Sequence, residues 1–280
     1  MSSFSILKFI PDKLYFHLKY FKHFRRIANF NNPSFFSEKI FIRMMKPLEI
    51  YSLLADRVKV RDYIKSVGCE EFLVPMIKTF DGVPTEEDLR SVKSGFVLKK
   101  NNSCGEVICI GENTVVNYKK IISTCEDWWT HDYSDVAREY HYSSIEPKII
   151  METFLGENIA DYKMHIFQDS DGKYEYLFRV GQKNLEGVMV YETSDQSWNA
   201  SAYKSYKKLN GQGPTSDKPL QLETMKEVGR KILGTLDYLR IDFYIVDDKL
   251  FIGEVTVTPT GGGQQFEPIS YDRDFFLMSS

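Results

Sequence analysis

The spacing of apolar residues divides the chain into helices, then a group of strands, and then a larger group of strands and helices. Two helices are predicted between residues 31 and 70. The first lies in "NPSFFSEKIFIRMMK", with Asn32 or Ser34 as its cap, and the second in "LLADRVKVRDYIKSVG", ending at Gly68. Residues 115–141 and 221–239 also have helical patterns, whereas 184–219 form a polar, turn-rich loop.

Short apolar runs bounded by turn residues predict the strands. They are "FLVPMIKTF", "GFVLKKN" and "GEVICIG", then "KIIMETFL", "YKMHIFQ" and "KYEYLFRVG", and a closing hairpin that starts at Arg240. Pro147 separates the first three runs from the rest. The predicted fold is therefore α+β, with an N-terminal helical segment (1–70), a small lobe (71–147), a large lobe (148–280) and a cleft between the lobes.

Residues 4–30 alternate aromatic, aliphatic and basic side chains, and Pro11 is expected to divide them into two short helices. A basic amphipathic helix can lie on an anionic membrane surface. The alternative is a helix that packs on the body of the protein with its bases in water. Both interpretations stay open on the sequence.

The closing hairpin, "RIDFYIVDDKLFIGEVTVTPTGGG", has Asp242 in its first strand and Glu254 in its second, both within apolar sequence. A three-residue loop at 246–248 makes them diagonal neighbours on one face. A two-residue loop at 247–248 places them on opposite faces unless a bulge intervenes. Neighbouring carboxylates in a dry site repel, and Mg2+ relieves that repulsion. The alternative is a strand-edge charge or a salt bridge.

Other charged residues interrupt apolar strands in the same way. "FVLKKNNSCG" ends a strand with Lys99 before a small polar turn that is able to hold phosphate. Glu152, Lys163 and Arg179 stand inside later strands. The alternatives are an ordinary hairpin with exposed lysines, edge positions, or side chains that extend to solvent. With Arg240, the set suits ATP-dependent phosphoryl transfer, and no P-loop, HRD or DFG motif is present.

Composition limits the function classes. The 280 residues are 42% hydrophobic with a net charge of −3, which excludes general nucleic-acid binding. The four cysteines form no CxxC pair, so neither a zinc site nor a disulfide framework is expected. No apolar run is long enough to span a membrane and no secretory signal is recognised, so the expected location is the cytoplasm, with peripheral membrane contact through 4–30 as an option.

In order and spacing, these segments resemble the ATP-grasp superfamily, and more closely its TupA-like members from bacterial surface-polysaccharide gene clusters. The resemblance extends from about Asn32 to Pro268. It is carried by "FSEKIFIRMM", "LLADRVKVRDYI", "FVLKKNNSCG", "IIMETFL", "DYKMHIF", "RIDFYIVDDKLFIGEVTVTP" and "GGGQQFEP". It implies an ATP-grasp fold in which the nucleotide lies between the lobes, with ATP and Mg2+ as cofactors.

The resemblance also implies roles for single residues. The nucleotide contacts it implies are Arg57, Lys99, Asn102, Ser103, Gly105, Glu152, Thr153, Phe154, Leu155, Asp161 and Lys163. Of these, Glu152 to Leu155 match the hinge whose backbone contacts adenine. The candidate catalytic residues are Arg240, Lys163 and Arg179, and the candidate metal ligands are Asp242, Glu254 and Thr256. Many ATP-grasp enzymes have Asn where this chain has Thr256, whereas TupA-like proteins commonly have Thr there. The resemblance therefore leaves open whether the site holds one Mg2+ ion or two.

The implied activity is a carboxylate–amine ligase that acts through an acyl phosphate. Its substrates would be a uronic acid of a sugar nucleotide, lipid-linked sugar or glycan, and an amino acid or amine. The acceptor site is expected at the N-terminal helices and the 184–219 loop, which holds Tyr191, Trp198, Tyr203, Lys204, Lys207 and Lys208. The alternatives are a kinase of sugar hydroxyls and a nucleotide-binding subunit of a glycosyltransferase. The sequence leaves the substrates and the oligomeric state open.

Overall fold

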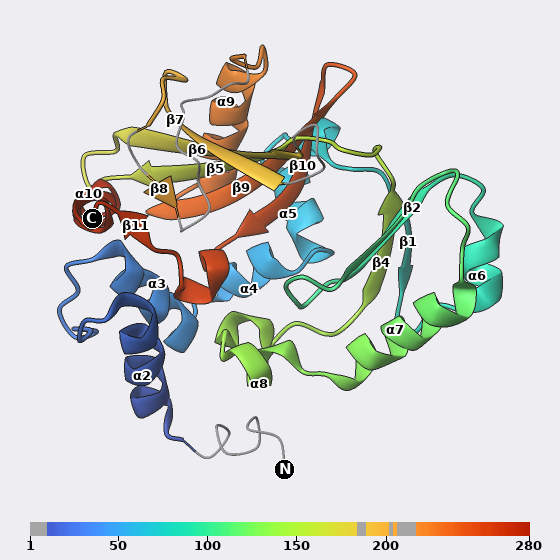
Figure 1. Cartoon of the computed structure of the whole chain (residues 1–280), viewed down its shortest axis with the longest axis horizontal. Coiled ribbons are helices and arrows are strands. Elements are labelled where there is room, and N and C mark those ends of the chain that lie inside the picture. Colours follow the sequence, from blue (N-terminus) through green and yellow to red (C-terminus); the bar gives the residue numbers. More distant parts are fainter. Residues whose placement is uncertain (1–9, 184–188, 202–203, 206–216) are drawn as a thin grey trace.

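The computed structural model describes residues 10–183, 189–201, 204–205 and 217–280, and its ribbon is drawn in Figure 1. The helices are α2 (Asp12–Phe24), α3 (Phe36–Met45), α4 (Glu49–Ala55), α5 (Lys59–Ser66), α6 (Glu86–Ser91), α7 (Tyr118–Thr130), α8 (Tyr133–Ala137), α9 (Leu222–Leu233) and α10 (Ser270–Met278). Short 3-10 turns are η1 (Glu70–Phe72), η2 (Tyr140–Tyr142) and η3 (Pro259–Gly262). No helix in these ranges combines the length and apolarity needed to cross a membrane.

The strands form two main antiparallel sheets. They are β1 (Met76–Phe80), β2 (Phe96–Lys100), β3 (Val107–Ile110), β4 (Ile149–Thr153), β5 (Asp161–Gln168), β6 (Tyr174–Lys183), β7 (Met189–Asp195), β8 (Lys204–Ser205), β9 (Tyr238–Val246), β10 (Lys249–Thr256) and β11 (Phe266–Glu267). The small sheet has the order β1-β4-β2-β3 and the large sheet the order β10-β9-β5-β6-β7. Strands β8 and β11 form a separate short pair.

Each main sheet has its own apolar core. In the small lobe, β2 alternates buried Phe96 and Leu98 with less buried neighbours, and its buried side packs with Leu89 of α6 and Ile121 of α7. In the large lobe, α9 covers one face of the sheet and buries Met225 and other apolar residues. The opposite face carries polar residues together with Phe167, Leu177 and Tyr238, which pack with Phe36 of α3 and Phe275 of α10 in a further apolar cluster.

The N-terminal helices pack beneath the large sheet, as Figure 1 shows. Phe16 and Tyr20 of α2 are fully buried against Phe41 and Met44 of α3. Burial of such side chains stabilises the fold by roughly 1.5–3 kcal/mol each. The interpretation of residues 4–30 as a helix packed on the body is confirmed for this face of α2. Helix α2 follows Pro11, and residues 1–9 lie outside the described ranges.

The cap of α3 differs from the prediction. Neither Asn32 nor Ser34 is the N-cap, which is Phe35. Instead, Oε2 of Glu38 accepts hydrogen bonds from the backbone N–H of Ser34 (2.8 Å) and of Phe35 (3.2 Å). A glutamate at the third helical position therefore satisfies the free N–H groups without a capping hydroxyl.

Several predicted elements are divided or extended. The stripe ending at Gly68 is two helices, α4 and α5, and the 115–141 helix is α7 and α8 with η2. Asp132 begins α8 because its Oδ1 accepts from the backbone N–H of Ser134 (2.8 Å). The predicted loop at 184–219 includes strand β7, which pairs with β6. Helix α10 was not predicted.

The chain passes between the two sheets after β4. The predicted boundary at Pro147 lies before this strand, yet β4 pairs with β1 and β2 in the small sheet. The segment between Thr153 and Asp161 therefore connects the sheets. It lines the space described below.

Candidate functional site

The closing hairpin has a two-residue turn and a bulge. Val246 pairs with Lys249, and Asp247 and Asp248 both have positive φ (48° and 62°). Of the two loops that the sequence left open, the two-residue loop at 247–248 is therefore the one present. The register shifts between Ile252 and Glu254, so Glu254 pairs directly with Asp242. The bulge alternative thus places both carboxylates on one face of the sheet.

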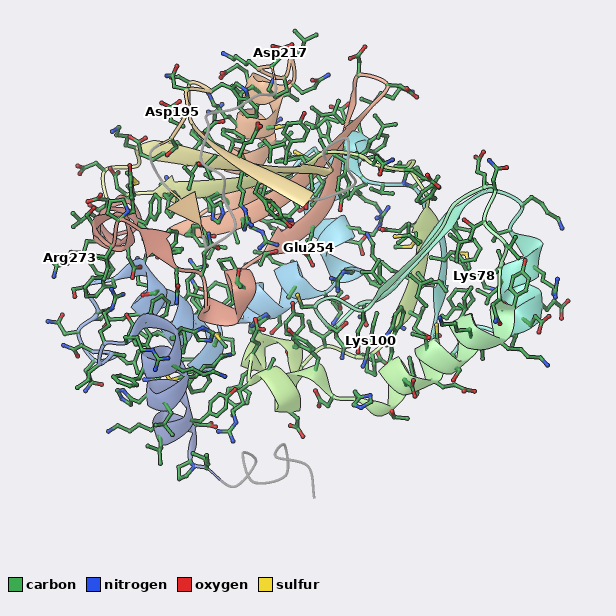
Figure 2. All side chains as sticks on the ribbon, in the orientation of Figure 1. Lys78, Lys100, Asp195, Asp217, Glu254 and Arg273 are labelled. Carbon is green, nitrogen blue, oxygen red and sulfur yellow. The ribbon has the colours of Figure 1, made fainter. Side chains whose placement is uncertain are left out.

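Four of the predicted residues form a row across the large sheet. Arg179 of β6 pairs with Lys163 of β5, Lys163 pairs with Asp242 of β9, and Asp242 pairs with Glu254 of β10. We call these four residues the charged row. Arg240 is two positions before Asp242 on the same face, directly opposite Thr256. Figure 2 shows Glu254 in the middle of the molecule, far from the peripheral Lys78 and Arg273.

Ion pairs connect the charged row to its neighbours. Lys163 Nζ lies 2.6 Å from Asp242 Oδ2 and 2.5 Å from Asp161 Oδ2. Arg240 donates to both oxygens of Asp242 (2.7 and 3.0 Å) and lies 3.4 Å from Glu254 Oε2. Burial alone would raise the pKa of Asp242, but the charges of Arg240 and Lys163 hold it below its usual value. Asp242 is therefore ionised at neutral pH.

A second group of ion pairs lies on the small lobe and α5. Glu152 on β4 accepts from Lys99 Nζ (2.7 Å) and from Arg61 Nη1 (3.0 Å). Arg57 donates through Nη2 to Glu254 Oε1 (2.6 Å) and through Nη1 to the carbonyls of Lys100 (2.8 Å) and Ser103 (2.5 Å). Arg57 therefore joins the loop after β2 to the metal-ligand candidate on β10.

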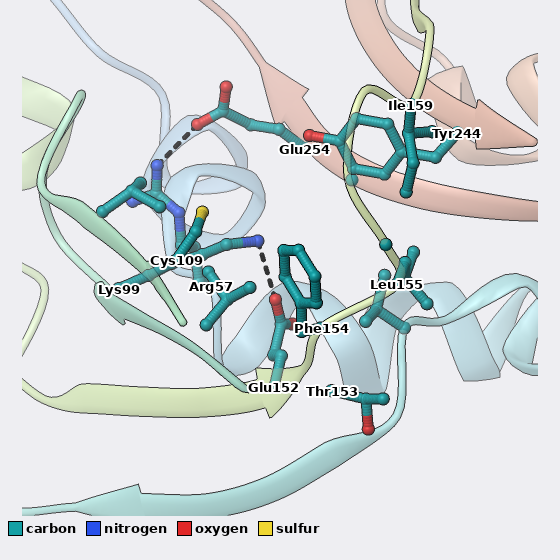
Figure 3. A pocket seen from close by; sticks show the side chains of 15 residues that line it. Arg57, Lys99, Cys109, Glu152, Thr153, Phe154, Leu155, Ile159, Tyr244 and Glu254 are labelled. Carbon is teal, nitrogen blue, oxygen red and sulfur yellow. Dashed lines mark hydrogen bonds and ion pairs between the residues drawn. The ribbon is translucent and has the colours of Figure 1, made fainter. Parts of the chain in front are cut away.

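A cavity of about 270 Å³ lies between the two sheets. Figure 3 shows Lys99 and Arg57 on one side of it and Tyr244, Ile159 and Leu155 on the other. Its lining residues are Arg57, Val74, Val97, Lys99, Val107, Cys109, Glu152, Thr153, Phe154, Leu155, Gly156, Ile159, Tyr244, Gly253 and Glu254. The cavity thus combines an apolar part with a charged part, as a nucleotide requires.

Side-chain hydrogen bonds hold the loop between β2 and β3 to the segment before β4 and to Asp56. Asn101 Nδ2 donates to Asp56 Oδ1 and to the Glu146 carbonyl (3.0 Å each). Asn102 Nδ2 donates to the Ile145 carbonyl (3.3 Å), and Gly105 has a φ of 84°, which favours glycine. In the part of the chain that the structure describes, Asn102 Oδ1 and Ser103 Oγ are buried without a hydrogen-bond partner.

The oxygen atoms beside the charged row fit Mg2+. Asp242 and Glu254 present carboxylates, and Thr256 Oγ1 and Asp161 Oδ1 are buried without a partner within the described residues. Mg2+ takes one or two carboxylates and completes its shell with water and phosphate. Over the same residues, no group of three or more His, Cys, Asp or Glu side chains is placed to hold a metal by itself.

The predicted residues differ in how close they lie to the cavity. Arg57, Lys99, Glu152, Thr153, Phe154, Leu155 and Glu254 line the cavity. Asp161, Lys163, Arg240 and Asp242 join Glu254 through the ion pairs above. Arg179 is in the charged row, but its guanidinium lies 4.0 Å from the centre of the Tyr191 ring, outside the cavity lining.

Two of the residues at the cavity were missed. Arg61 is on α5 and pairs with the lining residue Glu152, but Arg57 lies in the turn before this helix, so helical spacing gave no signal for Arg61. Tyr244 is two residues after Asp242 on β9, which places it on the same face. Strand periodicity applied from Asp242 would have identified Tyr244.

The predicted acceptor residues are only partly described. Trp198 is buried and packs on Tyr162 and Phe178 in the large core, so its assignment to an acceptor site is wrong. It follows Asp195, whose carboxylate holds the turn through the backbone N–H of Ser197. Tyr203, Lys207, Lys208 and the side chain of Lys204 lie outside the described residues.

Comparisons with solved structures return distant neighbours. A D-alanine–D-alanine ligase from Helicobacter pylori is 13% identical with a TM-score of 0.49, and the alignment covers 81% of this chain and 61% of that chain. An N5-carboxyaminoimidazole synthetase from Staphylococcus aureus, complexed with ADP, is 13% identical with a TM-score of 0.44, covering 75% and 46%. A biotin carboxylase–βγ-ATP complex from Campylobacter jejuni is 12% identical with a TM-score of 0.46, covering 82% and 47%. The chain thus spans about half the length of these neighbours, and a search of curated proteins finds no match.

A comparison with family models returns a match over most of the chain. The model of the TupA-like ATP-grasp proteins matches residues 38–275, from α3 to α10. The matched range includes both sheets, the cavity and the charged row. The match confirms the resemblance and the α+β fold. The chain belongs to the TupA-like ATP-grasp family.

Proposed function

We propose that the protein is an ATP- and Mg2+-dependent carboxylate–amine ligase that acts through an acyl phosphate. The observation that carries the proposal is that the charged row and Arg240 lie beside the cavity between the sheets, because Glu254 belongs to the row, pairs with Arg240 and lines the cavity. Bases for phosphate, carboxylates for a metal ion and an apolar wall for a nucleobase are thereby within one site.

The nucleotide residues divide by chemistry. The backbone at Glu152, Thr153, Phe154 and Leu155 would bind the adenine edge, with Tyr244 and Ile159 against its faces. Lys99, Lys163, Asp161 and Arg57, with the Asn102–Gly105 loop and its Ser103, would surround the phosphates. Asp242, Glu254 and Thr256 would hold Mg2+, which when bound neutralises developing negative charge on the phosphates.

Every base in the site already has a carboxylate partner. Lys99 is paired with Glu152, Lys163 with Asp242 and Asp161, and Arg57 with Glu254. Bound phosphates would pair with these bases in place of the carboxylates, and Asp242 and Glu254 would then be free to act as metal ligands. The site therefore exchanges ion-pair partners on binding, and no base is left buried without a counter-charge.

The proposed reaction has two steps. An oxygen of the acceptor carboxylate bonds to the γ-phosphorus, and the bond from that phosphorus to the ADP oxygen breaks. The amine nitrogen then bonds to the acyl carbon, phosphate leaves with the former carboxylate oxygen, and the nitrogen loses a proton. Arg240 is placed between Asp242 and Glu254, where it would steady the transferred group. Arg179 would act only by positioning Lys163, its cross-strand neighbour.

The proposed acceptor is a uronic acid of a bacterial surface polysaccharide or of its precursor, and the amine is an amino acid or small amine. Support comes from the family to which the chain belongs. Because the reaction consumes ATP, we place the protein in the cytoplasm. The face of the large sheet that carries the charged row is the proposed approach of the acceptor.

The test uses the full chain with ATP, Mg2+, a UDP-uronic acid labelled with heavy oxygen in its carboxylate, and an amino-acid mixture. The ligase predicts that phosphate release requires both acceptors, that the label enters the phosphate, and that the product gains one amino acid less water. Hydroxylamine in place of the amino acids should give a hydroxamate. A phosphorylated sugar without an amine would establish a kinase instead. ATP binding with no turnover on these acceptors or on membrane extracts would favour a nucleotide-binding subunit.

A further inference from the structure

Helix α2 has a second apolar face that is exposed. Leu14, Leu18 and Phe21 are 51%, 52% and 48% exposed and follow one another at helical spacing. They lie away from Phe16 and Tyr20, which are fully buried. Figure 1 shows α2 at the edge of the molecule, below α3. Exposed apolar residues that are scattered singly are ordinary, but a continuous stripe indicates a binding surface.

Bases flank this stripe without acidic partners. Lys13, Lys22 and Arg25 are exposed and form no ion pair within the residues that the structure describes. Arg26, by contrast, points inward to Asp272 and Ser37 and supports the fold. The exposed bases are therefore available to a partner outside the chain.

The charge of the chain is divided unevenly between this segment and the rest. Residues 1–30 contain six Lys or Arg and one Asp, a net charge of +5, whereas the whole chain carries −3. The remainder therefore carries −8. An anionic surface would attract the N-terminal segment and repel the body, and this would turn α2 toward that surface.

We propose that the exposed face of α2, formed by Leu14, Leu18 and Phe21 with Lys13, Lys22 and Arg25, lies on an anionic phospholipid bilayer. The apolar side chains would enter the acyl boundary while the bases remain among the phosphates. Ile27, 85% exposed just after the helix, would extend the contact. A symmetric contact between two α2 helices is disfavoured because their bases would repel each other.

The surface is separate from the proposed nucleotide site. Helix α2 precedes the range 38–275 that matches the family model, and none of its residues lines the cavity between the sheets. The orientation puts the N-terminal helices, rather than the cavity, against the lipid. Substitutions on the exposed face should therefore leave ATP turnover unchanged.

The test is co-sedimentation of the full chain with vesicles at low and high salt. One set contains phosphatidylcholine alone and the other equal parts of phosphatidylcholine and phosphatidylglycerol. We expect binding only to the anionic vesicles, weakened by salt. In a variant with Lys13, Lys22 and Arg25 all changed to Gln, the affinity for anionic vesicles should fall roughly fivefold for each base removed. Leu14, Leu18 and Phe21 changed together to Gln should abolish binding.

The matched control variants also replace three exposed bases, or three exposed apolar residues, by Gln, but at positions away from α2. Lys119, Lys120 and Lys249 are exposed bases, and Val115, Leu220 and Leu277 are exposed apolar residues, all away from α2. Gln at either control set should leave vesicle binding within about twofold. Circular dichroism confirms folding, and a Leu18→Trp variant provides a second readout, a blue shift in emission with anionic vesicles only.

Three results would overturn the proposal. The first is no binding to anionic vesicles by the wild-type chain, and the second is equal loss in the control variants. The third is a concentration-dependent dimer in analytical ultracentrifugation that the Leu14, Leu18 and Phe21 variant abolishes while vesicle binding persists, because a second copy would then occupy this face.

Discussion

At the scale of single residues, identical neighbours have different surroundings. Lys99 and Lys100 are consecutive in β2, so their side chains point to opposite faces. Lys99 faces the cavity and pairs with Glu152. Lys100 is 1% exposed and donates to the carbonyls of Trp128 and His131 at the end of α7. One lysine is therefore suited to binding and the other to holding a helix end.

Changing Lys99 and Lys100 separately to Met should give opposite results. Lys99→Met should weaken ATP binding by about tenfold, since one charge-assisted bond to phosphate is lost. Lys100→Met should leave the His131 carbonyl without this donor and the Trp128 carbonyl with only the backbone N–H of His131, and lower the free energy of unfolding by about 1–3 kcal/mol. Calorimetric ATP titration and urea unfolding of both variants measure the difference, and equal ATP affinities would refute the phosphate role of Lys99.

Glu254→Gln tests the metal ligand. The amide keeps the shape but loses the charge, so Mg2+-dependent ATP turnover should fall by roughly 10²-fold or more. Folding should persist because Glu254 is partly exposed at 28%. The exposed Glu112 changed to Gln is the control and should retain full activity. Full activity of Glu254→Gln at limiting Mg2+ would refute the assignment.

His141 should make the protein sensitive to acid. Its ring is 1% exposed, neither nitrogen has a partner among the described residues, and burial lowers its pKa to about 3. Between pH 6.5 and about 3 the unfolded chain binds this proton and the folded chain does not, so stability falls as pH falls. The loss is about 1.4 kcal/mol per pH unit.

A His141→Phe variant removes that dependence while it keeps a ring of similar size. Urea unfolding at several pH values below 6.5 gives the slope of the unfolding free energy against pH. This slope should be smaller in the variant by the amount that one bound proton contributes. The absolute stability at pH 7 is not the readout, because repacking alters it. Identical slopes for the two proteins would contradict the buried neutral state of His141.

At the scale of elements, the β9–β10 hairpin positions the metal ligands through its bulge. Gly253 lies at the register shift, and a Cβ there would come within 2.3 Å of Tyr244 Cε2. Glycine at this position therefore allows Tyr244 to lie flat against the strand at the cavity wall. The bulge in turn brings Glu254 opposite Asp242.

Gly253→Ala should accordingly destabilise the hairpin and disturb the cavity. We expect a loss of about 1–3 kcal/mol in unfolding free energy, since Tyr244 must leave its position, together with weaker ATP binding. Gly82→Ala is the matched control, because a Cβ at Gly82 meets nothing within 4 Å. Chemical unfolding of both variants measures the effect, and equal stabilities would show that the contact with Tyr244 is readily relaxed.

At the scale of the whole molecule, the two lobes meet through a few charged contacts and the cavity. Arg57, in the turn between α4 and α5, reaches the small-lobe carbonyls of Lys100 and Ser103 and Glu254 of the large lobe. Burial would lower the pKa of its guanidinium, but Glu254 and other negative groups raise it, so the charge is held. A single planar side chain therefore connects three parts of the fold.

Arg57→Lys should weaken that connection, because one ammonium cannot reproduce the guanidinium geometry. We expect a loss of about 1–3 kcal/mol in unfolding free energy, from buried carbonyls without a donor. Arg90→Lys on α6 is the control, since its pair with Glu86 is exposed and the change should stay within about 0.5 kcal/mol. Thermal unfolding of both variants decides whether Arg57 joins the lobes.

The sequence by itself determined the class of fold and most of the chemistry. Strands and helices were recognisable because apolar residues recur with the periods of sheets and helices. Charged residues within apolar strands indicated Lys163, Asp242 and Glu254, because such residues are seldom buried without a partner. The order of motifs was sufficient to identify the family.

Only the tertiary structure decided the register and the partners. The sequence left two hairpin loops open; the structure has the two-residue loop, and the bulge at Gly253 brings Glu254 to the face of Asp242. Trp198 seemed a loop residue but is buried, because β7 joins the edge of the large sheet. The pairing of each base with a carboxylate depends on contacts between residues distant in sequence, such as Arg57 and Glu254, which local patterns do not encode.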